Sequence, residues 1–420
     1  MSPEAELRGD ALATRRAVEA LRSGVPNADA VVALGSGQSD IEDRFTELLR
    51  EVSESPRSKR TASSLLLGAG FGQGKSHLLT HLGHLASSEG FVVSHVVIGK
   101  ETPLHDPAKV LRAAVESAVA AGARDVVAEA AAELDTDTAG YGELLRWLRG
   151  PGRDVNERFE ASLLLHERLR SDASGGDAEF VDDIVRFWCG DPLSIVDIRR
   201  QLKAIGEAKT FSFTPVRARD LARQRLHFLP RLLRAAGYAG WVVLLDEVEL
   251  IGRYSVLQRG RSYAELARWL DGEPGEPLVT VAAMTDDFEA AVLTGKGDRD
   301  ALPTKLRDKQ TEEYAEMASL AEVGMRHIER DTVPLVPADE AELDRVYRTL
   351  RALHGKAYDW EPPDIAGLER LGATRMRQYV RAWINEWDLI RLDPDYSPVT
   401  EVIEISSDYA EDSELTADDL

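Results

Sequence analysis

Cysteine is almost missing from this chain: Cys189 is the only one among 420 residues. A single cysteine excludes an internal disulfide framework and a cysteine metal site. Long apolar runs are missing too, because the longest have only the length of a strand, such as residues 241–245, and nothing resembles a signal peptide. Aromatic residues make up only 6%, but the hydrophobic content of 43% is that of a globular chain. We therefore expect a soluble cytoplasmic protein, away from membranes, with more than one domain.

Basic residues are also scarce, with 51 Lys and Arg against 73 Asp and Glu and a formal net charge of −22. This balance argues against nucleic-acid binding through bulk electrostatics, because phosphates are neutralised by lysines and arginines. Residues 406–420 hold six acids and no base. We expect this acidic tail to be disordered, with a role in solubility or, alternatively, in tethering or regulation.

One segment runs against the acidic trend. A solvated helix face would explain it, and so would a surface that contacts a partner protein or DNA. Residues 216–234 carry Arg217, Arg219, Arg223, Arg225, Arg231 and Arg234 against the lone Asp220.

The hydrophobic pattern predicts an α/β fold. Strands are expected at residues 64–67, 91–98, 241–246 and 278–284, with a weaker fifth at 332–336. A βαβ crossover needs roughly 30 residues, whereas about 140 residues of mostly helical pattern separate the second and third strands. We interpret this stretch as a helical insertion.

Residues 68–79 read GAGFGQGKSHLL, directly after the first strand and before a helix. Their Ala-x4-Gly-Lys-Ser spacing, in this context, is that of a phosphate-binding loop, whereas a merely structural glycine turn leaves the Lys-Ser pair unexplained. Lys75 would reach the β- and γ-phosphates at the helix N-terminus, and Ser76 would bind Mg²⁺. We predict ATP and Mg²⁺ as ligands, and expect His77 to pack or cap rather than catalyse. The predicted nucleotide contacts in this loop are Ala69, Gly70, Phe71, Gly72, Gln73, Gly74, Lys75, Ser76 and His77.

The third strand ends in two acids, Asp246 and Glu247. Open α/β sheets bind ligands at the carboxyl ends of their strands, so these acids are expected to face the phosphate-binding loop. Asp246 would join Ser76 around the Mg²⁺, and Glu247 would polarise the attacking water. Any strand can end in acids, but together with the loop they read as a Walker A and Walker B pair.

The fourth strand ends in Thr285, Asp286 and Asp287. ATPases with an additional strand between the phosphate-loop and Walker B strands place a polar residue here that senses the γ-phosphate. Thr285 is the candidate and Asp286 the alternative. The same residues could instead cap the next helix, and the two roles are compatible.

Arginines downstream could complete the phosphate site. Arg375 and Arg377 fall in the expected first turn of the last helix, where a cation is unfavourable to the helix dipole, so an anion is expected nearby. Arg375 is the candidate to contact the nucleotide, unless it is a surface arginine. Arg299 and Arg307 could supply an arginine finger to a neighbouring subunit of a homo-oligomer, although a flexible surface loop explains each more simply.

Together these features predict a P-loop NTPase fold of the AAA+-like type. An N-terminal helical segment, residues 1–52, would pack on the core. A P-loop ATPase domain would span residues 53–337 around the helical insertion at about 105–238. A C-terminal helical lid domain would span 338–405, before the acidic tail.

Several stretches resemble the ATP-binding proteins of bacterial BREX phage-defence systems (BrxD-like). They include RRAVEALRSGVPNADAVVALG, GFGQGKSHLL, FVVSHVVIGKETPLHDPAKV, VVLLDEVELIGRYSVLQRGRSYAELARWL and TRMRQYVRAWINEWD. The resemblance implies an AAA+-like ATPase, close to the origin-binding initiators, that works beside a helicase or methyltransferase component. It makes Lys75 and Ser76 the Walker A ligands and Asp246 and Glu247 the Walker B pair. Ala69 replaces the family's usual glycine, which is expected to slow turnover without preventing binding.

Three functions stay open at this stage. The first is an ATP-hydrolysing protein whose nucleotide state controls its engagement with partners or DNA in anti-phage defence. The second is a scaffold that holds ATP without hydrolysing it, which the presence of Glu247 disfavours. The third is an initiator-like DNA loader, which the arginine-rich segment favours and the overall acidity disfavours.

Overall fold

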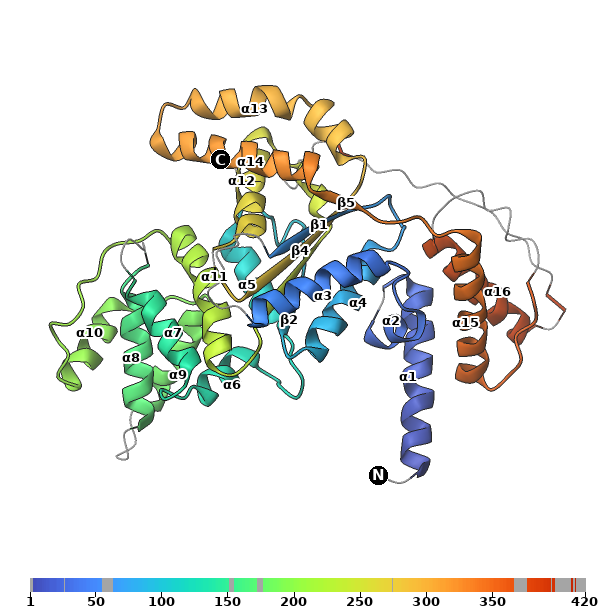
Figure 1. Cartoon of the computed structure of the whole chain (residues 1–420), viewed down its shortest axis with the longest axis horizontal. Coiled ribbons are helices and arrows are strands. Elements are labelled where there is room, and N and C mark those ends of the chain that lie inside the picture. The colour runs from blue at the N-terminus through green and yellow to red at the C-terminus, as the bar shows by residue number, and fades with distance from the viewer. Residues whose placement is uncertain are drawn as a thin grey trace.

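The structure is a computed structural model, whose described part contains a five-stranded sheet with the strand order β2-β3-β4-β1-β5 (Figure 1). All neighbouring strands are parallel. The strands are β1 (Ser64–Gly68), β2 (Val92–Val97), β3 (Trp241–Asp246), β4 (Leu278–Met284) and β5 (Thr332–Pro334). The structure describes residues 3–25, 27–54, 63–150, 155–171, 177–273, 275–365, 376–393, 395–396, 409–410 and 412.

Both faces of the sheet are covered, which explains why its strands are apolar throughout. In β3, the side chains of Trp241, Val243 and Leu245 join one hydrophobic core, and those of Val242 and Leu244 join another. This alternation follows the two-residue period of a strand. β4 lies between β1 and β3, which is the arrangement on which the prediction for Thr285 depends.

Helices on the two faces fix the position of the sheet. α3 (Ser39–Glu54) and α4 (Lys75–Ser88) cover the face of Val242. α12 (Val256–Asp271) and α14 (Glu312–Arg330) cover the opposite face. These two helices touch so closely that a Cβ at Gly324 would lie 2.0 Å from the Tyr263 carbonyl oxygen, so a glycine is required there. The remaining elements of this region are η1 (Val248–Arg253), η2 (Glu289–Thr294) and α13 (Asp298–Arg307).

The stretch between β2 and β3 is helical and extends to one side of the sheet (Figure 1). Its interior is an aromatic cluster in which the Phe159 ring lies 5.4 Å from Phe187 and 5.0 Å from Phe228. This cluster is continuous with the core beneath β3. The helices are α5 (Pro107–Glu116), α6 (Val126–Glu133), α7 (Ala139–Leu148), α8 (Arg158–Ser171), α9 (Ala178–Cys189), α10 (Ile195–Ala204) and α11 (Ala218–Ala235).

Helices from both ends of the chain share a third, separate core. α1 (Pro3–Ser23) and α2 (Ala28–Leu34) pack with α15 (Glu340–Tyr358) and α16 (Met376–Leu392), as Figure 1 shows. Val18 of α1 thereby lies in one cluster with residues of α15 and α16. Of the N-terminal segment, it is α3 that joins the core against the sheet. The C-terminal helices α15 and α16, which were expected to form a lid domain, therefore share their hydrophobic core with α1 and α2.

No helix in the described part of the chain is both long and apolar enough to cross a membrane.

Candidate functional site

The loop between β1 and α4 carries the predicted phosphate contacts. Gly72 (φ +79°) and Gly74 (φ +103°) adopt left-handed backbone conformations, which glycine reaches without strain. α4 begins at Lys75 with no side chain capping its first turn, so its leading N–H groups are available to a ligand. The loop is internally braced, because the N–H of Gly70 donates to Oε1 of Gln73 (2.7 Å).

Lys75 points back into the protein at the start of α4. Its side chain is buried, its Nζ donates to the carbonyl oxygen of Ala69 (3.1 Å), and it lies 3.5 Å from Oε1 of Glu249. Ala69 is itself buried, so a small side chain suits this position. A phosphate at this place would compete with Glu249 for the lysine.

Asp246 ends β3, buried to 4% exposure and opposite Val97 of β2. Its Oδ2 lies 3.5 Å from Nε2 of His95. Burial would raise the pKa of Asp246, but hydrogen bonds from His95 and Ser76 outweigh it and hold the pKa below its ordinary value. The structure thus brings together Ser76 and an ionised Asp246, the two residues predicted to bind Mg²⁺.

These two residues fit the ligands that Mg²⁺ prefers, since it takes oxygen donors and is commonly held by one or two carboxylates plus substrate phosphates and water. Among the residues that the structure describes, no group of three or more His, Cys, Asp and Glu is placed to hold a metal alone. A magnesium ion here would therefore depend on oxygen atoms from the nucleotide.

Glu247 follows Asp246 in a left-handed backbone conformation (φ +59°), which is rare and strained for a residue with a side chain. Its backbone N–H donates to Oδ1 of Asp246 (2.9 Å). Burial, followed by the negative charge of Asp246, raises the pKa of Glu247, and the positive charges of Lys75 and Arg377 offset part of the rise. The raised pKa lies closer to neutral pH, where a carboxyl can accept and release a proton during a reaction.

Sequence reasoning missed Glu249 and His95, although both adjoin the predicted residues. Glu249 is buried in η1, and burial raises its pKa to about 7 despite the opposing charge of Lys75. The repeated acid in the string Asp-Glu-Val-Glu was a signal for Glu249. Its contact with Lys75 depends on the turn that η1 makes, which the string does not reveal.

The C-terminal helices reach the loop through Arg377. Its backbone N–H donates to the carbonyl oxygen of Gly72 (3.3 Å), and its guanidinium lies 5.7 Å from the centre of the Phe71 ring. Arg375, the residue predicted to contact the nucleotide, lies outside the described residues. Arg377, the other arginine of the expected first turn, is therefore the one that the structure describes beside the loop.

A cavity of about 390 Å³ lies beside the loop. Its walls come from α1 and α2, from residues 35–38 and 335–339, from the start of α4, and from α15 and α16. His77 forms part of the wall, with Nε2 lying 2.7 Å from the carbonyl oxygen of Gly35. Burial lowers the pKa of His77, so the neutral ring donates this hydrogen bond and ties α4 to the end of α2. This is the packing role expected for His77.

The family model described as BREX system ATP-binding protein BrxC/D matches residues 11–121 and 169–401. The chain belongs to this family. No curated protein and no solved structure matches it. The family's description confirms the predicted resemblance and supports an ATP-binding role in a defence system.

The ranges matched by the BrxC/D family include both candidate motifs and the C-terminal helices. The unmatched residues 122–168 contain α6, α7 and most of α8. This chain therefore differs from the family pattern within the helical insertion, away from the loop and β3.

Thr285 lies at the end of β4 and is buried, whereas Asp286 is exposed. The hydroxyl of Thr285 is hydrogen-bonded to the hydroxyl of Tyr409. Of the acidic tail, residues 406–408, 411 and 413–420 lie outside the described residues, so its expected disorder stays a prediction. The described residues Tyr409 and Asp412 both contact the body of the protein. The Thr285 side chain thus faces a residue more than a hundred positions away.

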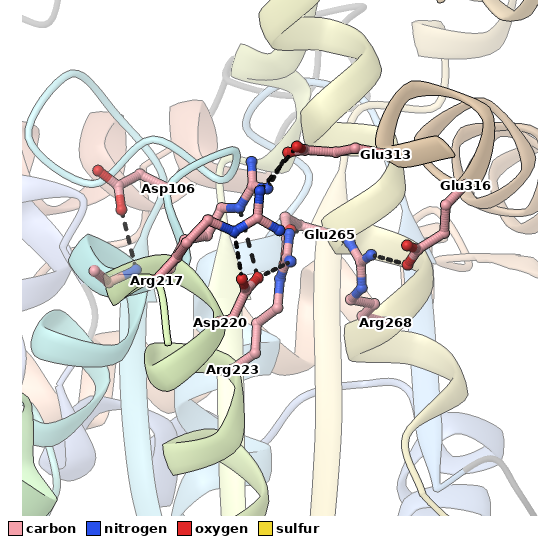
Figure 2. A network of polar contacts seen from close by, with 10 residues as sticks. Asp106, Arg217, Asp220, Arg223, Glu265, Arg268, Glu313 and Glu316 are labelled. Carbon is pink, nitrogen blue, oxygen red and sulfur yellow. Dashed lines mark hydrogen bonds and ion pairs between the residues drawn. The ribbon is translucent and has the colours of Figure 1, made fainter. Parts of the chain in front are cut away.

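The arginines of the arginine-rich segment have partners within the chain, and Figure 2 shows those of Arg217 and Arg223. Arg217 and Arg219 both bind Glu313 of α14, and Arg223 binds Glu265 of α12 and Asp220. Arg225 and Arg231 are buried: Arg225 donates to backbone carbonyl oxygens, and Arg231 pairs with Glu273 and Glu276. The expectation of a solvated helix face is therefore wrong for Arg225 and Arg231.

Both arginine-finger candidates are also paired within the chain. Arg299 binds Glu289 (2.9 Å) and Glu329 (2.5 Å), and Arg307 binds Glu322 (2.8 Å). Both arginines lie on the surface of helix α13, so the alternative of a flexible surface loop is wrong. Nothing in the geometry of these pairs favours a contact with a neighbouring subunit.

Proposed function

We propose that this protein binds ATP with Mg²⁺ and hydrolyses it, as an AAA+-like ATPase of a BREX-type anti-phage defence system. The observation that carries the proposal is the meeting of Lys75 and Ser76 with Asp246 and Glu247 at one edge of the sheet. About 170 residues separate the two pairs in the sequence. Lys75, Asp246 and Glu249 are buried close together, with Glu247 partly buried beside them. A shared ligand would account for this concentration of charged groups.

Binding would begin at the uncapped start of α4. The β- and γ-phosphates would accept hydrogen bonds from the backbone N–H groups of the loop, at the positive end of the helix dipole. Lys75 would exchange its contact with Glu249 for a phosphate oxygen. The cavity of about 390 Å³ beside Gly74 and Ser76 offers room for the nucleoside, and Arg377 would close the site from α16.

Ser76 and Asp246 would hold the magnesium ion, which when bound neutralises phosphate charge and polarises the γ-phosphate. The low pKa of Asp246 keeps its carboxylate charged for this task. His95 steadies that carboxylate from β2.

Glu247 would position and deprotonate the attacking water. Its raised pKa suits a general base, and its left-handed backbone is the kind of strain that persists where the side chain must point in one direction. Thr285, on the strand between β1 and β3, would orient the water or sense the γ-phosphate.

Comparing Glu247→Gln with the wild type tests this proposal. The variant should bind ATP with nearly unchanged affinity, since an amide replaces the carboxyl without loss of volume, but its steady-state hydrolysis should fall by about 100-fold or more. Glu289→Gln, which changes an exposed carboxyl on η2, serves as the control and should keep full activity. Equal turnover by the Glu247→Gln and wild-type proteins would contradict the assignment of the base.

The same measurement separates hydrolysis from the scaffold function. If the wild type and Glu247→Gln are equally inactive while ATP still raises the melting temperature, the protein holds ATP as a structural ligand. We further propose that the nucleotide state controls its engagement with other defence proteins, such as a helicase or methyltransferase component. The loader function loses its main support, because the arginines that suggested it have internal partners.

A further inference from the structure

Tyr409, near the end of the chain, contacts the protein at the carboxyl end of β4. Its hydroxyl is hydrogen-bonded to Thr285 and donates to Oδ1 of Asp287 (2.7 Å). Its ring packs edge-on against Phe288, with ring centres 6.0 Å apart at 85°. A Cβ added at Gly252 would lie 2.8 Å from Cδ1 of the tyrosine, so the ring approaches the backbone of η1 closely. Four contacts thus hold one side chain.

Asp412 provides a second anchor three residues later. Its Oδ2 lies 2.9 Å from a guanidinium nitrogen of Arg253, and its backbone N–H donates to the carbonyl oxygen of Arg253 (3.2 Å). Both side chains of the ion pair are partly shielded from water. Arg253 ends η1, the element that also carries Glu249. Tyr409 and Asp412 therefore contact η1, which follows β3, and the turn that follows β4.

The direction of the hydrogen bonds indicates what this contact does to Thr285. A tyrosine hydroxyl has one proton, and here it is donated to Asp287, whose carboxylate can only accept. The hydrogen bond between the two hydroxyls must then use the single proton of Thr285, which points at the tyrosine oxygen. While Tyr409 is docked, Thr285 has no proton left to donate to a phosphate oxygen or to water.

We propose that Gly252, Arg253, Thr285, Asp287 and Phe288 form a docking site for the chain's own acidic C-terminal segment, and that the docked segment slows hydrolysis by occupying Thr285. We name these five residues the tail-docking site. The effect on hydrolysis rests on the proposed function, whereas the docking itself does not. The occupant is a tyrosine followed three residues later by an acid, in cis.

Tyr409→Phe tests the effect on Thr285, since it keeps the ring and removes only the hydroxyl. We expect kcat to rise by about two- to ten-fold with little change in KM, because the hydrogen bonds of the hydroxyl with Thr285 and Asp287 are both lost and Thr285 is freed. Tyr358→Phe is the matched control: its hydroxyl binds Glu19, at the far helical cluster, and its removal should leave kcat unchanged. An unchanged or lower kcat in Tyr409→Phe would overturn the inhibitory role.

Docking is measured separately, with no nucleotide present. The full-length double variant Tyr409→Ala, Asp412→Ala is titrated against a fluorescent peptide of residues 406–420, and the anisotropy gives a Kd. A peptide carrying Tyr409→Phe and Asp412→Asn should bind about tenfold more weakly or worse. Equal binding of the two peptides, or none by the native one, would overturn the docking site. If no variant hydrolyses ATP, the proposed function fails while this titration still decides the docking.

Mixing distinguishes the chain's own tail from that of a second copy. The active double variant is combined with an excess of Lys75→Ala protein, which keeps its tail but should not bind ATP. For docking in cis we expect the mixture to hydrolyse at the rate of the double variant alone. A several-fold slower rate would show that the segment docks between molecules and would overturn the assignment in cis.

Discussion

The start of α4 offers one buried cation, Lys75, whereas residues 216–234 offer six arginines. By charge alone the arginine-rich segment is the stronger candidate for binding phosphate. In the structure its arginines bind Glu313, Glu265, Asp220, Glu273, Glu276 and backbone carbonyl oxygens. Lys75 instead has a carbonyl and one carboxyl, Glu249, whose own pKa is raised by burial.

The comparison shows that an anion site depends on which partners the fold has already supplied. An added phosphate at α11 would have to displace ion pairs that are already formed, such as that of Arg223 with Glu265 in Figure 2. Several of these pairs lie partly or fully out of water. At the start of α4 the phosphate would meet N–H groups that no side chain caps. It would also meet Lys75, whose present partner Glu249 has a pKa raised by burial. Four predictions break or sharpen this contrast.

Lys75→Ala should have the largest effect. Losing the cation that faces the triphosphate is expected to lower ATP affinity by about a thousand-fold, which corresponds to roughly 4 kcal/mol. Titration calorimetry with ATP and Mg²⁺ measures this directly. Lys305→Ala, at an exposed position of α13, should bind like the wild type. Wild-type affinity in Lys75→Ala would show that the loop is not the phosphate site.

Arg231→Met should mainly affect stability. Arg231 and its partner Glu276 are buried, and removing one member of a buried pair costs about 3 kcal/mol. Glu276 also raises the pKa of His227, despite the opposing effect of burial, so a protonated His227 replaces part of the lost charge. The loss in melting temperature should therefore be greater at pH 8 than at pH 6. Arg348→Met, which breaks an exposed pair with Asp344, should change it little.

Glu249→Gln should change the pH dependence of stability. Burial raises the pKa of Glu249 from 4.5 to about 7, so between these values the folded protein holds a proton that the unfolded chain has released. The wild type therefore loses stability from this group as the pH rises from about 4.5 to 7, and the amide variant does not. We expect Glu249→Gln to gain roughly 3 kcal/mol relative to the wild type across this range. If the melting temperatures of the two proteins changed with pH in the same way, the burial of this charge would be contradicted.

The double variant Arg217→Gln, Arg219→Gln should have the smallest effect, and the quantity to measure is its affinity for DNA. Because both side chains are engaged by Glu313, we expect the double variant to bind duplex DNA as weakly as the wild type does, with the same dependence on salt. A salt slope reduced by about one or two would show that these arginines do contact phosphates. Fluorescence anisotropy at several salt concentrations provides the measurement.

The predicted strands and the loop were found from local pattern because their physical causes are local. A strand buried on both faces must be apolar along its length, and a turn into a helix that binds phosphate needs glycines followed by lysine and serine. β4 also lies between β1 and β3, which is the strand order that the prediction for Thr285 requires. Residue 375, by contrast, lies outside the described part, so its assignment stays a prediction.

Other contacts of the candidate site join parts of the chain that no local pattern connects. Glu249 meets Lys75 through the turn of η1, Arg377 meets Gly72 across more than 300 residues, and Tyr409 meets Thr285 from the far end of the chain. The N-terminal helices likewise share a core with α15 and α16. Each of these arrangements is set by packing between elements, for which sequence spacing gives no signal.

The sequence by itself therefore determined the parallel sheet and the candidate residues at the ends of β1 and β3, since these follow from periodicity and residue type at neighbouring positions. Only the tertiary structure decided which charges remain available. Whether an arginine, a lysine or a hydroxyl can act on a ligand depends on the partner that folding places beside it, and here those partners come from distant parts of the chain.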